Sequence, residues 1–188
     1  MKLVYGGYIM EAWDVYDSQG NPTGKVTERG GEFLEGEYHL AGSLWIINQN
    51  KEILIQKRSL QKKRSPGKWS ITGGAAKAGE NSRQACIREV AEEIGLTLNE
   101  SDITLIYRTI GKDFIFDDYA IIHDFPMNEA VLQAEEVSEI KWVSAEEIKE
   151  LFDSGQFAFV DINDFDKVIA FINDNFTCCN KRHAEGPP

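Results

Sequence analysis

Apolar residues occur in short alternating or continuous runs along most of the chain, and this pattern predicts β-strands. In EAWDVYD the apolar side chains alternate with polar ones, and the turn-forming SQGNPTG follows, so residues 11–29 are predicted to form a β-hairpin. The other predicted strands are bounded runs rich in β-branched and aromatic residues: 38–48, 52–58, 68–72, 102–111, 113–125 and 139–143. We expect the strands at 102–111 and 113–125 to be antiparallel.

Three segments have a helical pattern instead. Residues 82–94 begin where Asn81 or Ser82 can cap a helix, and they end before Gly95, the residue type that most often terminates one. The apolar positions of this helix form one stripe that we expect to face a core: Cys86, Ile87, Val90, Ala91 and Ile94. The other predicted helices are 144–155, which opens with a Ser144–Glu147 capping box, and 162–176. Mixed strands and helices of this kind indicate an α/β (α+β) fold in which helices sandwich a mixed sheet.

The same pattern divides the chain into four parts. We expect residues 1–9 to be an N-terminal extension and residues 10–36 to hold the β-hairpin and a following loop. Residues 37–176 contain the remaining strands and all the helices, and they form the predicted main domain. Residues 177–188, TCCNKRHAEGPP, are predicted to be a flexible tail.

Composition narrows the classes of partner. The 188 residues are 42% hydrophobic and 27% charged, which is typical of a globular protein. A net charge of −11 repels nucleic-acid backbones, so a DNA or RNA partner is not expected. No apolar run reaches the ~18–20 residues needed to span a bilayer, and MKLVYGGYIM lacks the apolar stretch of a secretory signal. The chain is therefore expected to be cytoplasmic and not to engage a membrane.

The helix at 82–94 carries an unusual group of acidic residues. Glu89, Glu92 and Glu93 are spaced so that they share one face, where like charges repel each other. A divalent cation such as Mg²⁺ would relieve this repulsion, because it prefers carboxylate oxygens and often also contacts substrate phosphates. The preceding strand and loop can bring the Gly73 carbonyl near the same cation, and Glu80 can form an ion pair with Arg88.

These residues fall in a longer motif: Gly74, five residues, Glu80, seven residues, and then REVAEEIGL, residues 88–96. The motif resembles the Nudix box at every defined position. The resemblance implies a Mg²⁺- or Mn²⁺-dependent hydrolase that cleaves a diphosphate linkage, with an α/β/α sandwich fold. It also implies that Glu89, Glu92 and Glu93 are metal ligands, and that Glu89 is a plausible base for the attacking water.

Members of this family often add one acidic residue from a later loop. In LQAEEVSE the candidates are Glu135 and Glu136, of which Glu136 is favoured, and Asp117 or Asp118 is left open.

A second resemblance covers residues 11 to about 150. The segments YHLAGSLWIIN, KRSLQKKRSPGKW and LQAEEVSEIKWVS are similar to the isopentenyl diphosphate isomerase-like branch of the same superfamily. The resemblance implies that Arg58 and Lys62 grip the substrate diphosphate. His39 falls where the isomerase has a metal-binding histidine, although a lone histidine in an apolar strand is more often a hydrogen-bonded core residue.

The isomerase's other functional positions are not preserved. Its catalytic cysteine corresponds to Gly74, its second metal-binding histidine to Ala76, and its catalytic glutamate is nearest to Asp118. A hydrolase of a small nucleoside diphosphate derivative or related organic diphosphate is therefore the leading hypothesis. The alternatives are an isoprenoid diphosphate isomerase and a catalytically silent nucleotide-binding module. The substrate itself is not readable from the sequence, and a homodimer is left open.

Overall fold

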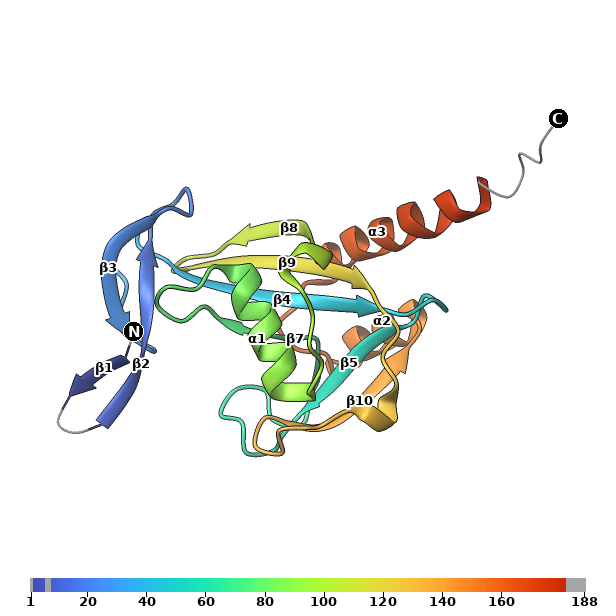
Figure 1. Ribbon diagram of the computed structural model, residues 1–188, viewed down its shortest axis with the longest axis horizontal. Coiled ribbons are helices and arrows are strands. Elements are labelled where there is room, and N and C mark those ends of the chain that lie inside the picture. Colours follow the sequence, from blue (N-terminus) through green and yellow to red (C-terminus); the bar gives the residue numbers. More distant parts are fainter. Residues whose placement is uncertain (1, 6–7, 182–188) are drawn as a thin grey trace.

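Two β-sheets organise the computed structural model, which describes residues 2–5 and 8–181, with side chains from 11 to 176 (Figure 1). The larger sheet has the order β10-β5-β4-β9-β8, with β6 paired to β5 and β7 paired to β4. Its strands are β4 (His39–Ile47), β5 (Ile53–Arg58), β6 (Trp69–Ser70), β7 (Thr72–Ala75), β8 (Thr104–Ile110), β9 (Phe114–Ile122) and β10 (Val137–Val143). β4 and β9 are parallel, whereas the other pairs are antiparallel, so the sheet is mixed as predicted.

The smaller sheet lies at one end of the larger one and has three antiparallel strands (Figure 1). They are β1 (Lys2–Tyr5), β2 (Tyr8–Tyr16) and β3 (Pro22–Glu28). The β2–β3 pair is the predicted hairpin. Because β1 pairs with β2, residues 2–5 of the expected N-terminal extension are part of this sheet.

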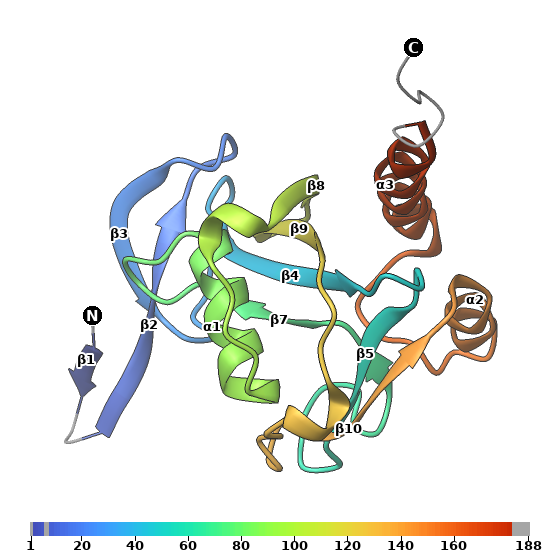
Figure 2. The same cartoon turned by 45° about the vertical axis from the view of Figure 1, so that its right-hand side comes forward.

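Helices cover both faces of the larger sheet (Figure 2). α1 (Ser82–Ile94) packs on one face, and α2 (Ala145–Asp153) and α3 (Ile162–Lys181) pack on the other. Short 3₁₀ helices at Glu100–Asp102 and Met127–Glu129 lie in the connections. None of the helices in the described residues is long and apolar enough to cross a membrane.

The alternation of β4 explains the two cores. Leu44 points into the cluster that contains Val90 of α1, whereas Trp45 points into the cluster that contains Phe165 of α3. Both side chains are fully or almost fully buried. A central strand that is buried on both faces has a continuous apolar sequence, and this is why 38–48 does not alternate with polar residues.

The bounds of α1 follow from its caps. The Asn81 side chain accepts a hydrogen bond from the Gln84 backbone N–H at 2.9 Å, and Gly95 ends the helix with φ 79°. A Cβ at position 95 would also lie 3.0 Å from Val131, so glycine is required for two reasons. The predicted Ser144–Glu147 capping box is confirmed at the start of α2.

Three expectations differ from the structure. Ala91 is exposed instead of facing the core. The strand predicted at 68–72 is split into β6 and β7, which pair with different neighbours, and β7 includes Gly73 and Gly74. The prediction of a flexible tail is wrong for residues 177–181, because α3 continues to Lys181. No Gly or Pro lies between Gly155 and Gly186 to end the helix earlier. Residues 182–188 lie outside the described residues.

Candidate active site

Arg88 is the centre of the acidic face of α1. Its Nε donates a hydrogen bond to Glu80 Oε1 at 2.8 Å, and its Nη1 donates to Glu89 Oε1 at 2.7 Å and to Glu92 Oε2 at 3.0 Å. Its Nη2 reaches the Ala75 carbonyl at 3.1 Å. Burial lowers the pKa of Arg88, but the hydrogen bonds to Glu80 and Glu89 outweigh burial, so the pKa lies above its usual value. The predicted Glu80–Arg88 ion pair is present, and it fixes the loop before α1 to the helix.

Glu89 lies directly against Gly74. A Cβ built on Gly74 would come within 2.6 Å of the Glu89 carboxylate, closer than any real contact. Gly74 sits opposite Gly42 in the β4–β7 pair, on the face that α1 covers. The glycine therefore creates the space in which the Glu89 carboxylate lies.

Glu93 is 4% exposed, which is rare for a carboxylate. Its Oε2 accepts a hydrogen bond from Gln56 Nε2 at 2.7 Å, and Gln56 Oε1 accepts one from Thr72 Oγ1 at 3.0 Å. Burial raises the pKa of Glu93 to about 7; Gln56 opposes this shift, and the nearby charge of Glu89 adds to it. Glu93 is thus a buried carboxylate that is held by Gln56 of β5, and Gln56 is in turn held by Thr72 of β7.

The end of α1 is electrostatically unfavourable. Glu92 and Glu93 lie in the last turn, which contains no basic residue, and the helix dipole disfavours negative charge there. Within the described residues, no three acidic, histidine or cysteine side chains are close enough together to form a cation site as they stand. The groups still suit Mg²⁺ or Mn²⁺ chemically, because the side chains of Glu89, Glu92 and Glu93 supply only oxygen ligands, and each is already held by a hydrogen bond.

The Gly73 carbonyl has a suitable orientation to join them. Ala76 N donates to Leu40 O at 2.8 Å, which makes Leu40–Ala76 a hydrogen-bonded pair of the antiparallel ladder. In such a ladder hydrogen-bonded and non-hydrogen-bonded pairs alternate, so the Gly73 carbonyl, like that of Ala75, points away from β4. Arg88 contacts the Ala75 carbonyl, so Gly73 is on the edge of β7 that faces the acidic network.

The two predicted phosphate-binding residues have different surroundings. Arg58 is half-buried two residues after Gln56 on the same face of β5, and its charge interacts with Glu93. Lys62 forms an ion pair with Glu136, the acidic residue that the sequence favoured as an extra metal ligand. The loop that carries Glu136 docks on the end of α1, where Gln133 N donates to Glu93 O at 3.0 Å.

Asp117 and Asp118, left open as further acids, are bound elsewhere. Asp117 accepts hydrogen bonds from Arg108 Nε at 2.6 Å and from Ser82 Oγ at 2.5 Å. Asp118 is bound by Ser43 Oγ and by Trp45 Nε1, the latter at 3.1 Å. Both are buried within the sheet. Glu135 is exposed.

His39 packs among aromatic rings. Its ring centroid lies 4.8 Å from that of Trp13 in a stacked arrangement, with Phe33 and Phe114 at 5.7 and 6.2 Å. Burial lowers the pKa of His39. The expectation that it is hydrogen-bonded is not met at Nδ1, which is buried without a partner among the described residues.

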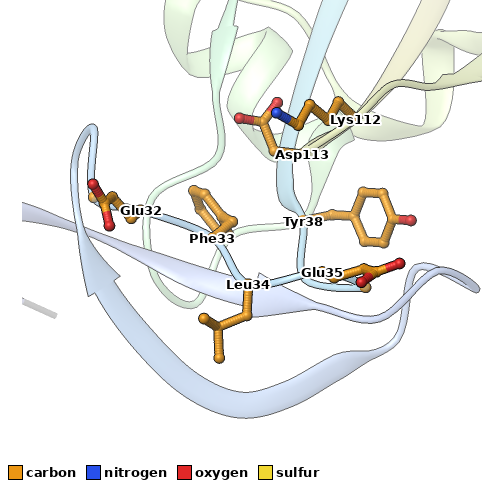
Figure 3. A pocket seen from close by; sticks show the side chains of 9 residues that line it. Glu32, Phe33, Leu34, Glu35, Tyr38, Lys112 and Asp113 are labelled. Carbon is orange, nitrogen blue, oxygen red and sulfur yellow. The ribbon is translucent and has the colours of Figure 1, made fainter.

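Two surface hollows lie outside the group formed by Glu89, Glu92 and Glu93. One of about 740 Å³ is lined by the loop 31–36 with Tyr38, Lys112 and Asp113 (Figure 3). Another of about 450 Å³ contains Glu80 and Arg108. Neither is lined by Glu89, Glu92 or Glu93, so the chemistry of these side chains, and not a surface hollow, marks the candidate site.

Three further residues of the site were not foreseen from the sequence. Gln56 and Thr72 orient Glu93, and Lys77 pairs with Glu92 at 3.5 Å. A polar residue inside an otherwise apolar strand, as Gln56 is in ILIQKR, was the available signal.

Comparison with known proteins identifies the family and the fold of this chain. Residues 37–161 match the family model described as the NUDIX domain. An uncharacterized Nudix hydrolase of Listeria innocua is 37% identical over 150 residues, which cover 79% of this chain and 88% of that protein. An isopentenyl-diphosphate Delta-isomerase of Salmonella arizonae is 30% identical over 151 residues, which cover 76% of this chain and 82% of that protein. The solved structure of DR0079 from Deinococcus radiodurans has a TM-score of 0.67 at 18% identity, covers 82% of this chain and 96% of that one, and shows the same fold.

Proposed function

Since the chain belongs to the Nudix hydrolase family and is related to its isopentenyl diphosphate isomerase-like branch, we propose that it hydrolyses the diphosphate linkage of a small nucleoside diphosphate derivative or related organic diphosphate. We propose Mg²⁺ or Mn²⁺ as the cofactor. When bound, such an ion neutralises charge on the diphosphate and lowers the pKa of water. The observation that carries the proposal is the buried Glu93, which is held by Gln56 and lies close enough to Glu89 for the charge of Glu89 to disfavour its own.

The proposed roles combine the family resemblance with the contacts of each side chain. Glu92, Glu93 and the Gly73 carbonyl hold the ion together with Glu89, and Glu136 is the extra acid from the later loop. Glu89 takes the proton of the attacking water; Arg88 binds its Oε1, which leaves Oε2 to accept that proton. Arg88 and Glu80 keep the loop and helix aligned, and Arg58 and Lys62 bind the diphosphate.

The test is a screen of nucleoside diphosphates, nucleotide sugars, dinucleotides and prenyl diphosphates with Mg²⁺, with and without EDTA. The best substrate is then assayed with Glu92→Gln and Glu93→Gln. We expect each variant to lose at least about 100-fold in kcat, because each removes a ligand charge. In Glu93→Gln the new amide oxygen can still accept a hydrogen bond from Gln56, so the fold should persist. Glu139→Gln, on the exposed part of β10, is the matched control. Parental activity in both site variants would refute the assignment.

A second readout does not depend on turnover. Binding of Mg²⁺ to the native state should raise the melting temperature of the parent. Glu93→Gln should reduce that increase, whereas an unchanged increase would place the ion elsewhere on the molecule.

The isomerase hypothesis is disfavoured by the surroundings of three positions. Gly74 has no side chain to transfer a proton, and Glu89 already fills the space there. Ala76 cannot bind a metal with His39, and Asp118 is bound by Ser43 and Trp45. Incubation with isopentenyl diphosphate in deuterated water distinguishes the two reactions, because isomerisation places deuterium on carbon and hydrolysis does not. A silent binding module would show neither product.

A further inference from the structure

Phe159, between α2 and α3, has an unusual backbone and an unusual exposure. Its φ is 69°, in the left-handed region that an aromatic residue rarely adopts, and its side chain is 52% exposed. The preceding residues are fixed against β6, since Trp69 N donates to Gln156 O and Ala158 N donates to Trp69 O, both at 2.9 Å. The chain is therefore held up to Ala158 and then turns so that the Phe159 ring points outwards. Strain of this kind persists where the surrounding structure imposes it, often at functional sites.

Two guanidinium groups lie on the Phe159 ring. The Arg58 Cζ is 4.7 Å from the ring centroid and the Arg64 Cζ is 5.7 Å from it. Arg58 Nε also donates a hydrogen bond to the Arg64 carbonyl at 3.1 Å. This bond holds the β5–β6 loop against the end of β5. The ring thus restricts both planar cations to one small region.

Neither guanidinium forms an ion pair within the described residues. Among the described residues, no acidic side chain lies within 4.0 Å of Arg58 or Arg64, whereas Arg88, Arg108 and Lys62 all have acidic partners. Burial lowers the pKa of Arg58; the charge of Glu93 opposes this shift, and the adjacent charge of Arg64 adds to it. Two unpaired cations on one ring repel each other, and an anion between them would relieve that repulsion.

The Arg58–Arg64 pair lies near the acidic face of α1. Arg58 follows Gln56 by two residues on β5, so both side chains leave the same face of the strand, and Gln56 holds Glu93. An anion bound by Arg58 would therefore lie beside the proposed ion site. A phosphate group of the substrate is the anion that the proposed reaction supplies there.

We propose that Arg64 binds the substrate diphosphate directly, together with Arg58, and that Phe159 positions the two guanidinium groups for this contact. The proposal rests on the proposed function for the identity of the ligand. Guanidinium groups bind phosphate oxygens with two parallel hydrogen bonds, and a ring that fixes their planes makes that geometry available before the substrate arrives. Lys62, which is already paired with Glu136, contributes less.

The direct test is calorimetric binding of methylenediphosphonate, a non-hydrolysable diphosphate, to the full chain in EDTA. Arg64→Gln should weaken binding about 10-fold, because a charge-assisted bidentate contact is lost. Lys63→Gln removes the same charge from the neighbouring position and should leave the dissociation constant within about 2-fold of the parent value. Equal effects of the two substitutions would mean general electrostatic attraction and would overturn the proposal.

The role of Phe159 is tested by three substitutions. Phe159→Leu keeps an apolar side chain but no π-system, and we expect KM for the best substrate to rise about 5-fold with kcat nearly unchanged. Phe159→Tyr should restore the parental KM. Phe159→Gly should raise KM while the melting temperature stays the same or increases, because glycine removes the backbone strain. A KM that is unchanged in Phe159→Leu, or a Tyr variant no better than the Leu variant, would refute the positioning role.

The two proposals can fail separately. Hydrolysis that requires Glu93 but is insensitive to Arg64→Gln and Phe159→Leu would refute the guanidinium pair and leave the proposed function intact. Binding of methylenediphosphonate that depends on Arg64, with no hydrolysis of any diphosphate, would support the pair and refute the proposed function.

Discussion

Gln56 donates a hydrogen bond of 2.7 Å to Glu93, and this contact joins the second strand of the main sheet to the end of the acidic helix. Thr72 Oγ1 donates to the other atom of the same amide, Gln56 Oε1, and so fixes which way the amide points. A buried carboxylate without such a donor would carry a large desolvation penalty. The neighbouring strands therefore determine the position of the carboxylate in the protein alone.

This contact predicts an effect on stability that a double-mutant cycle can measure. Gln56→Leu leaves the buried carboxylate of Glu93 without its donor and should cost about 1–3 kcal/mol in the free energy of unfolding. The double variant Gln56→Leu/Glu93→Leu should be more stable than Gln56→Leu, because no unpaired buried charge remains. The cycle is measured by urea denaturation at pH 8, and additive effects of the two substitutions would contradict the prediction.

Gly74→Ala should separate activity from stability. The added Cβ would lie 2.6 Å from the Glu89 carboxylate, the end of a flexible side chain that can move away at little cost. We expect the melting temperature to fall by less than about 4 °C and kcat to fall on the order of 100-fold, because Glu89 is displaced. Gly111→Ala is the control, since its Cβ would meet the Phe114 ring at 2.2 Å. Gly111→Ala should lose stability but keep its kcat. The role of Glu89 would be refuted if Gly74→Ala kept its kcat while Gly111→Ala lost it.

Arg58 and Lys62 should differ in their effects on substrate affinity. Arg58→Gln removes an unpaired guanidinium and should raise KM about 10-fold with little change in kcat. Lys62→Gln should raise KM by less than about 3-fold, because Lys62 must first leave Glu136 before it can contact a phosphate. Steady-state kinetics with the best substrate of the screen provide the measurement. A larger effect from Lys62 than from Arg58 would show that the ion pair with Glu136 opens in solution.

Asp118 should make stability depend on pH. Burial raises its pKa to about 6, above the unfolded value, although Ser43 and Trp45 oppose the shift. The folded state then binds the proton more tightly, so the contribution of Asp118 is most favourable below about pH 4 and is lost as pH rises through about 6. Between about pH 4 and about pH 6, the free energy of unfolding of the parent should fall by on the order of 2–3 kcal/mol relative to that of Asp118→Asn. A difference between the two proteins that stays constant from pH 4 to about pH 7 would contradict the shifted pKa.

Features that depend only on residues close together in the chain could be predicted from the sequence. Asn81 or Ser82 can start a helix and Gly95 can end one, so the sequence predicts the bounds of α1 to within one residue. The spacing of Glu89, Glu92 and Glu93 places them on one helical face in any fold that keeps the helix. The buried run of β4 likewise required a sheet covered on both faces. The Glu80–Arg88 pair could be foreseen because only one short loop and two helical turns separate the residues.

Contacts between residues distant in the chain were decided only by the tertiary structure. Gln56 meets Glu93 across 37 positions, and Lys62 meets Glu136 across 74, because β5 is brought beside the end of α1 and the loop before β10. The orientation of Asp118 into the sheet, away from the acidic face, depends on its register opposite Ser43. Phe159 stacks on Arg58 and Arg64 only because the backbone turns through a strained conformation that no local sequence signal favours. Such placements depend on the packing of whole strands and helices, and the free energy of that packing is not contained in any single segment.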